Sequence, residues 1–220
     1  MTLPAFDVHR FPRVDLTGGA YPQELASTGP TSSRSFLGLS TRGFTAATGY
    51  LATGLLALTL LVGPVNLVLR RRNPVSGYLR RDVGIWAATL SAVHVLYGLQ
   101  VHARLARFFT YFAASDGTPL RNAFGIANWT GLAALVIAVG LLALSSDAAL
   151  GRLGARTWKA LQRFNYALFA LVVVHAIFYG AFLRTSSPYT SVLLLSLVAV
   201  VTGQSIGVLL YRRRLRARRS

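Results

Sequence analysis

Long apolar runs separated by short polar segments dominate the chain from residue 44 onward. The five runs cover roughly 44–69, 83–102, 125–144, 163–183 and 190–211. An α-helix needs about 20 apolar residues to cross the ~30 Å hydrocarbon core of a bilayer. Because backbone polar groups find no water there, each run should be helical. The pattern therefore predicts an all-α membrane protein, a bundle of five transmembrane helices.

The segment before the first run has a different composition. Residues 1–42 are polar and are interrupted by several prolines and glycines, a composition typical of an irregular tail. No charged stretch is followed by an apolar stretch there, so we expect no cleavable signal peptide. The predicted organisation is an irregular tail (1–42), a five-helix domain (43–211) and a basic cytoplasmic tail (212–220).

The charged residues indicate an orientation. The chain has 23 Lys and Arg against 6 Asp and Glu, a net charge of +17. Nucleic-acid binders are also this basic, but here the cations lie between apolar runs, so we expect no nucleic-acid partner. In a five-helix chain, fifteen of them fall on one side, which places the C-terminus in the cytoplasm and the N-terminus outside. With nearly all cations arginine, we expect a multi-pass protein of a bacterial inner membrane, surrounded by lipid.

The residue types that are absent from the chain, or from its apolar runs, argue against several kinds of functional site. The chain contains no cysteine, which excludes disulfides, thiolate-bound iron–sulfur clusters, c-type heme attachment and a catalytic thiol. Its only lysine, Lys159, is expected in a polar loop, and no carboxylate lies within an apolar run, which argues against acid-based ion transport. The remaining metal-ligand candidates are His9, His94, His102 and His175.

Two of these histidines share a predicted depth in the membrane. His94 lies 13 residues after Arg81, and His175 lies 12 residues after Arg163. If both arginines mark the cytoplasmic interface, the helical rise places each histidine ~18–20 Å along its helix. The second and fourth helices run in the same direction, so the two imidazoles can face each other across a planar macrocycle. This arrangement predicts a heme whose iron has two histidine axial ligands.

The other residues of the predicted heme site follow from helical spacing. His102 lies ~12 Å beyond His94, too far to bind the same iron, and we expect it at the interface and His9 in solvent. Arg104, Arg107 or Arg121 is expected to pair with the propionates. The positions expected to contact heme share a helix face with one histidine: Leu90, Gly98, Leu171 and Tyr179, with Ala87, Ser91 and Leu168 nearby. In the alternative interpretation these small residues only allow close helix packing, and the histidines are hydrogen-bonding groups between helices.

Two segments resemble a known family. Residues 79–86 (LRRDVGIW), followed by His94, resemble the first heme-ligand helix of the ferric reductase-like transmembrane family. Residues 145–166, with Trp158 and Tyr166, followed by His175, resemble that family's second ligand segment. The similarity covers roughly residues 50–205. It implies a bundle of heme-bearing helices in which His94 and His175 ligate heme b. It also implies electron transfer from a cytoplasmic flavin reductase or a membrane quinol to an external acceptor.

The chain departs from the family pattern at the inner side. Where related two-heme reductases have histidines, 13 residues before each outer ligand, this chain has Arg81 and Gln162. We therefore predict one heme and no inner heme. A quinol near Gln162, Asn165 and Arg81 is one hypothesis for the donor; the alternative is that these side chains anchor helix ends at the interface.

Three functions are consistent with these features. The first is a redox subunit and not a complete enzyme. The chain has no G-x-G-x-x-G nucleotide motif, so we expect another protein or a quinol to supply the electrons. The second is a reductase that delivers electrons directly to ferric or cupric ions. The third is a heme-free membrane scaffold or transporter with the same helical fold.

Overall fold

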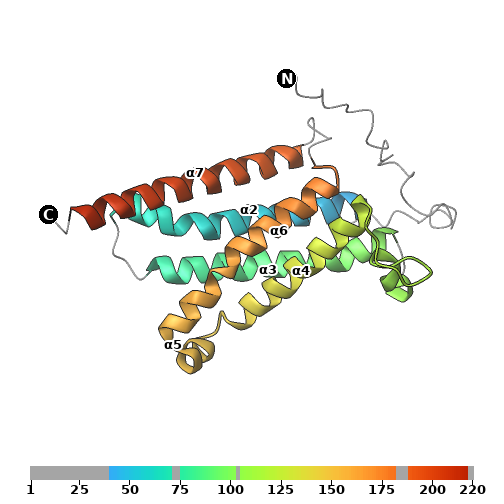
Figure 1. Cartoon of the computed structure of the whole chain (residues 1–220), viewed down its shortest axis with the longest axis horizontal. Helices are drawn as coiled ribbons and strands as arrows, with labels where there is room; N and C mark the ends of the chain where they lie inside the picture. The colour runs from blue at the N-terminus through green and yellow to red at the C-terminus, as the bar shows by residue number, and fades with distance from the viewer. Residues whose placement is uncertain (1–39, 71–74, 103–104, 182–187, 218–220) are drawn as a thin grey trace, which may run out of the picture. The chain divides into compact units, whose positions relative to one another are not determined.

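The structure is a computed structural model that describes residues 40–70, 75–102, 105–181 and 188–217. These residues belong to one compact unit, Arg34–Ser220. The described helices, shown in Figure 1, are α2 (Thr41–Val68), α3 (Val75–His102), the 3₁₀ helix η2 (Leu105–Tyr111), α4 (Ala123–Ala143), α5 (Asp147–Gln162), α6 (Phe164–Phe178) and α7 (Pro188–Arg216). Five helical segments are long and apolar enough to cross a membrane, which confirms the prediction of a multi-pass helical protein.

Four of the helices form a bundle. Among these four, the pairs α2–α3 and α4–α6 pack most extensively, and contacts between α2 and α6 and between α3 and α4 close the ring. Helices α3 and α6 therefore lie diagonally across the bundle, so side chains from both can meet at its centre. This places the two histidine-bearing helices opposite each other.

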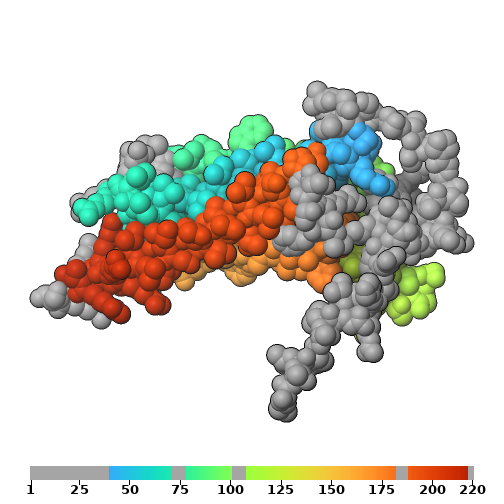
Figure 2. Space-filling view, turned by 90° about the horizontal axis from the view of Figure 1, so that it is seen from above, coloured from blue at the N-terminus to red at the C-terminus, as the bar shows by residue number. Residues whose placement is uncertain are grey.

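Helix α7 lies outside the bundle, along α2 (Figures 1 and 2). Gln204 Nε2 donates to the Leu60 carbonyl at 2.8 Å, and its Oε1 accepts from the Tyr166 hydroxyl of α6 at 3.2 Å. At the basic end of α7, Arg214 donates to the Leu67 carbonyl in the last turn of α2 at 2.8 Å. These polar contacts satisfy backbone acceptors and fix the register of α7.

The core is apolar and draws on all five membrane-spanning segments. Its buried side chains include Leu60 from α2, Ala87 from α3, Ala138 from α4, Leu168 from α6 and Leu193 from α7. Leu193 is fully buried, with 0% of its surface exposed. Many large apolar side chains point outward instead, which is expected where the surroundings are lipid and packing, not water exclusion, holds the helices together.

Several helix ends differ from the sequence-based expectation. Helix α3 begins at Val75, so Arg80 and Arg81, expected in a loop, lie inside it. Helix α6 ends at Phe178 and does not reach residue 183, because Gly180 takes a φ of 76° and its N–H bonds back to the Ile177 carbonyl. A left-handed glycine of this kind terminates a helix where hydropathy alone would extend it.

The expectation that Lys159 lies in a polar loop is wrong, because the connection from α4 to α6 is helix α5. Ser146 Oγ caps it by accepting from the Ala149 N–H at 3.1 Å. Asp147 lies in its first turn and Lys159 in its last, the charge order that the helix dipole favours. None of its residues is buried, so α5 is a surface helix and not a further span.

Gly154 interrupts α5 with a φ of 71° and a ψ of 156°. We expect Gly154→Ala to lower the free energy of unfolding by about 1 kcal/mol, because an L-residue is strained at positive φ. Gly151→Ala is the matched control: it lies three residues earlier, and a methyl group added at either position meets open space. Thermal unfolding in detergent compares the two variants. Equal stability would contradict the backbone explanation.

Candidate functional site

The histidines of α3 and α6 meet at the centre of the bundle. The ring centroids of His94 and His175 are 6.1 Å apart, and the ring planes are inclined by 80°. Both side chains are partly buried. The shared depth predicted from the sequence is therefore matched by direct proximity of the two imidazoles.

Hydrogen bonds define which nitrogen of each ring carries the proton. His94 Nδ1 lies 2.8 Å from the Thr45 carbonyl oxygen of α2, and His175 Nδ1 lies 2.8 Å from the Ala127 carbonyl oxygen of α4. A carbonyl only accepts, so Nδ1–H must be the donor in both rings. In the neutral imidazole, Nε2 then keeps its lone pair, which is the state required of a metal ligand.

The distance between the rings fits a shared metal ion. Metal–imidazole bonds of about 2 Å on both sides place two ring centroids roughly 6 Å apart, close to the observed 6.1 Å. Within the described ranges, no group of three or more His, Cys, Asp or Glu side chains gathers. The donor set here is a pair of imidazoles, which suits an ion whose remaining ligands belong to a macrocycle.

Tyr179 and Gly98, two of the predicted heme contacts, lie one helical turn after His175 and His94. The Tyr179 ring centroid is 4.9 Å from that of His175, and its hydroxyl donates to Asn128 Oδ1 at 2.7 Å. Gly98 lies against Thr45, whose Cγ2 would be 3.5 Å from an added Cβ. Both residues are thus next to the groups that hold the imidazoles.

The remaining predicted contacts lie between the histidine pair and the N-terminal ends of α3 and α6. Leu90 and Leu171 lie one helical turn before His94 and His175 and are partly buried. One turn further in, Ala87 and Leu168 are buried in the apolar core. Packed apolar side chains therefore line both helices directly below the imidazoles.

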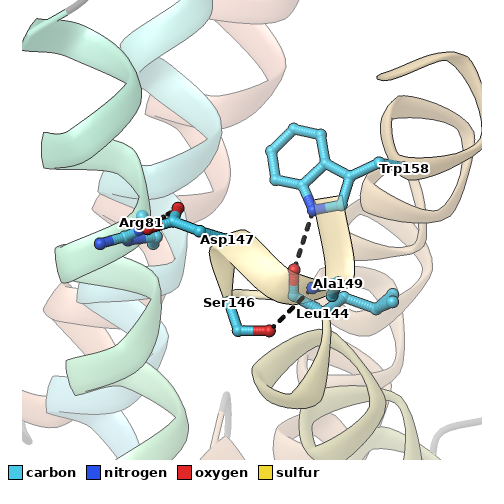
Figure 3. A network of polar contacts seen from close by, with 6 residues as sticks. All are labelled: Arg81, Leu144, Ser146, Asp147, Ala149 and Trp158. Atoms are coloured by element: carbon cyan, nitrogen blue, oxygen red, sulfur yellow. Dashed lines mark hydrogen bonds and ion pairs between the residues drawn. The ribbon is translucent and has the colours of Figure 1, made fainter. Parts of the chain in front are cut away.

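Arg81 and Gln162, the two positions where the resemblance led us to look for histidines, are engaged in other contacts. Arg81 Nη1 lies 2.7 Å from Asp147 Oδ1, an ion pair that joins α3 to the start of α5 (Figure 3). Gln162 Oε1 accepts from Asn165 Nδ2 at 3.2 Å, and Asn165 is buried. The sequence reasoning did not identify Asp147 as the partner of Arg81, because the contact joins residues 66 positions apart.

Trp158 closes the turn between α4 and α5. Its Nε1 donates to the Leu144 carbonyl at 2.8 Å, at the end of α4 (Figure 3). The α5 segment is thus attached both to α3, through Asp147, and to the end of α4. Ser146, Asp147 and Trp158 therefore shape the turn between α4 and α5.

The other predicted site residues contribute little to the described geometry. His102 is the last residue of α3, and Arg121 is exposed just before α4. The expectations for His9, for Arg104 and for the side chains of His102 and Arg107 lie outside what the structure describes. The sequence reasoning missed the residues of α2 and α4 that hold the rings. The sequence gives little signal for them, because Thr-Gly occurs at 48–49 and at 130–131 but also at 17–18, 28–29, 53–54 and 202–203.

Comparison with known families gives one finding. The family model for the ferric reductase like transmembrane component matches residues 48–174, more than half of the chain. The matched segment runs from α2 into α6 and ends next to His175. Neither the curated proteins nor the solved structures include a match. The chain therefore belongs to the ferric reductase-like transmembrane family, whose members are membrane redox components.

Proposed function

We propose that this protein is a membrane b-type cytochrome, an electron-transfer subunit that carries electrons from a quinol or a cytoplasmic flavin reductase to an external acceptor. The observation that carries the proposal is the pair formed by His94 and His175, with ring centroids 6.1 Å apart and both Nε2 lone pairs available. Membership of the ferric reductase-like family supports it independently.

In this proposal His94 and His175 are the axial ligands of heme b. The bound heme supplies a one-electron iron couple. The protein keeps both imidazoles neutral and aimed at the centre of the bundle through their Nδ1–H bonds. With both axial positions filled by protein, the site suits electron transfer and not substrate coordination.

The topology of the proposal follows the charge distribution. The basic ends of α5 and α7 are assigned to the cytoplasm and the N-terminus to the outside, in the inner membrane of a bacterium. The histidine pair then lies in the outer half of the membrane, close to an external acceptor. The segments around residues 79–86 and 145–166 resemble in particular MsrQ, the heme-binding membrane subunit of the periplasmic methionine sulfoxide reductase system. A periplasmic oxidoreductase is therefore the acceptor that we propose.

We also propose a single heme. Gln162 is hydrogen-bonded to Asn165, and Arg81 is paired with Asp147, which supports a role for these side chains in anchoring the inner helix ends. The hypothesis of a quinol bound beside them requires these contacts to open. We therefore favour a version of the proposal in which the electron donor binds elsewhere in the inner half of the protein.

The test is an absorption spectrum of the purified protein, oxidised and dithionite-reduced, with heme quantified as the pyridine hemochrome. We expect a low-spin b-type spectrum and about one heme per chain. Two hemes per chain would contradict the single site. No heme after expression with ample heme supply would overturn the proposal and leave the scaffold or transporter function. Direct reduction of ferric or cupric ions by the reduced protein alone would favour the metal reductase.

A further inference from the structure

The two helix pairs of the bundle hold their histidines in the same way. In the α2–α3 pair, the Thr45 carbonyl accepts from His94 Nδ1 at 2.8 Å and from the Thr48 hydroxyl at 3.0 Å, a hydroxyl that is shared with the Phe44 carbonyl at the same distance. Gly49, the next residue, lies directly against the imidazole. One turn of α2 therefore provides a carbonyl that accepts from the imidazole, a hydroxyl that also donates to this carbonyl, and a glycine that leaves room for the ring.

The α4–α6 pair repeats this arrangement at the same relative positions. The Ala127 carbonyl accepts from His175 Nδ1 at 2.8 Å and from the Thr130 hydroxyl at 2.9 Å, a hydroxyl that is shared with the Ile126 carbonyl at 2.8 Å. Gly131 follows and lies against the ring. The accepting residue precedes its histidine by 49 positions in the first pair and by 48 in the second. The two pairs thus form an internal structural repeat.

Glycine is required at these two positions because the imidazole leaves no room for a side chain, and not because the backbone conformation needs it. A Cβ built on Gly49 would lie 2.6 Å from His94 Nδ1, and one on Gly131 would lie 2.6 Å from His175 Nδ1. Any side chain at either position would push the imidazole away from the carbonyl that binds it. The hydrogen bond and the ring position therefore depend on the same glycine.

We propose that the two Thr-Gly pairs, Thr48-Gly49 and Thr130-Gly131, are positioning residues of the histidine pair. Each glycine seats an imidazole on the neighbouring helix, and each threonine adjusts the strength of the Nδ1–H bond by sharing its acceptor. The expected effect on the midpoint potential rests on the proposed function, in which the two imidazoles ligate heme iron.

The threonine hydroxyl has a defined electronic effect. Two donors to one carbonyl oxygen weaken each other, so removing the hydroxyl strengthens the Nδ1–H bond. A stronger bond from Nδ1–H makes the ligating Nε2 more basic, which stabilises ferric over ferrous iron. Loss of the hydroxyl should therefore lower the midpoint potential.

The first test replaces the glycines. Gly49→Ala and Gly131→Ala should each reduce heme affinity about 10-fold or more, or shift the low-spin spectrum toward high spin. Gly63→Ala in α2 and Gly140→Ala in α4 are matched controls, because an added Cβ meets nothing within 4 Å at either position. Heme content and spectrum of all four variants equal to the parent would overturn the proposal.

A second set of variants tests the role of the threonines even if the glycine variants fail to accumulate as folded protein. Thr48→Val and Thr130→Val keep the branched shape and remove only the hydroxyl, so heme should be retained with a lowered midpoint potential. Thr59→Val is the control: the buried Thr59 hydroxyl of α2 makes the same kind of bond, to the Leu55 carbonyl at 2.9 Å. An unchanged potential in Thr48→Val and Thr130→Val would overturn the tuning role.

A third measurement separates this inference from the proposed function. If the parent protein binds no heme, the proposed function fails, but the seating of the rings can still be tested. In protein labelled with ¹⁵N-histidine, the nitrogen shifts should show Nδ1 protonated and Nε2 unprotonated for His94 and His175 at neutral pH. Protonated Nε2 with bare Nδ1 would overturn the inference without reference to heme.

Discussion

Replacing His94 or His175 with alanine is expected to reduce heme content from about one per chain by at least about 10-fold. Each substitution removes one of two axial ligands while leaving the opposite imidazole hydrogen-bonded to its helix carbonyl. Any heme that remains should be high-spin, because the iron then has one protein ligand and an open position. Pyridine hemochrome quantitation and the reduced absorption spectrum measure both effects.

The matched control is His102→Ala. His102 belongs to the same helix as His94 and lies eight residues, or ~12 Å, beyond it, so its removal should leave the heme content and the low-spin spectrum unchanged. Loss of heme in His102→Ala together with normal heme in His94→Ala would show that the ligand pair is assigned incorrectly. Near-normal low-spin heme in both His94→Ala and His175→Ala would contradict the site altogether.

Leu193→Ala is expected to lower the free energy of unfolding by about 2–4 kcal/mol. Leu193 is fully buried, with 0% exposure, in the core that joins α7 to the bundle. Its truncation leaves a cavity that lipid cannot fill, so the packing contacts are lost without replacement. The thermal unfolding midpoint in detergent should fall accordingly.

Leu195→Ala is the control for that substitution. It makes the same chemical change in the same helix, two residues away, on a side chain that is 69% exposed. We expect a change of about 0.5 kcal/mol or less. Equal losses of stability in Leu193→Ala and Leu195→Ala would mean that α7 does not pack on the bundle through Leu193.

The spans and the depth of the histidines could be predicted from the sequence, whereas the inner connections could not. Hydropathy placed five spans because the bilayer imposes a minimum length on every apolar helix. It misplaced the start of α3, where Arg80 and Arg81 continue the helix into the polar region, and it missed α5. The structure of α5 depends on an N-cap at Ser146 and on a tertiary ion pair with Arg81, neither of which contributes to hydropathy.

The sequence by itself determined that this is a helical membrane protein and that His94 and His175 share a depth. Both properties follow from numbers of residues along single helices, because the fixed rise per residue converts such a number into a length. Only the tertiary structure decided that the two ring centroids lie 6.1 Å apart and that the Thr45 and Ala127 carbonyls accept hydrogen bonds from the imidazoles. Those contacts join residues 48 and 49 positions apart, and which carbonyl meets which ring depends on how the helices pair and rotate, which no local pattern specifies.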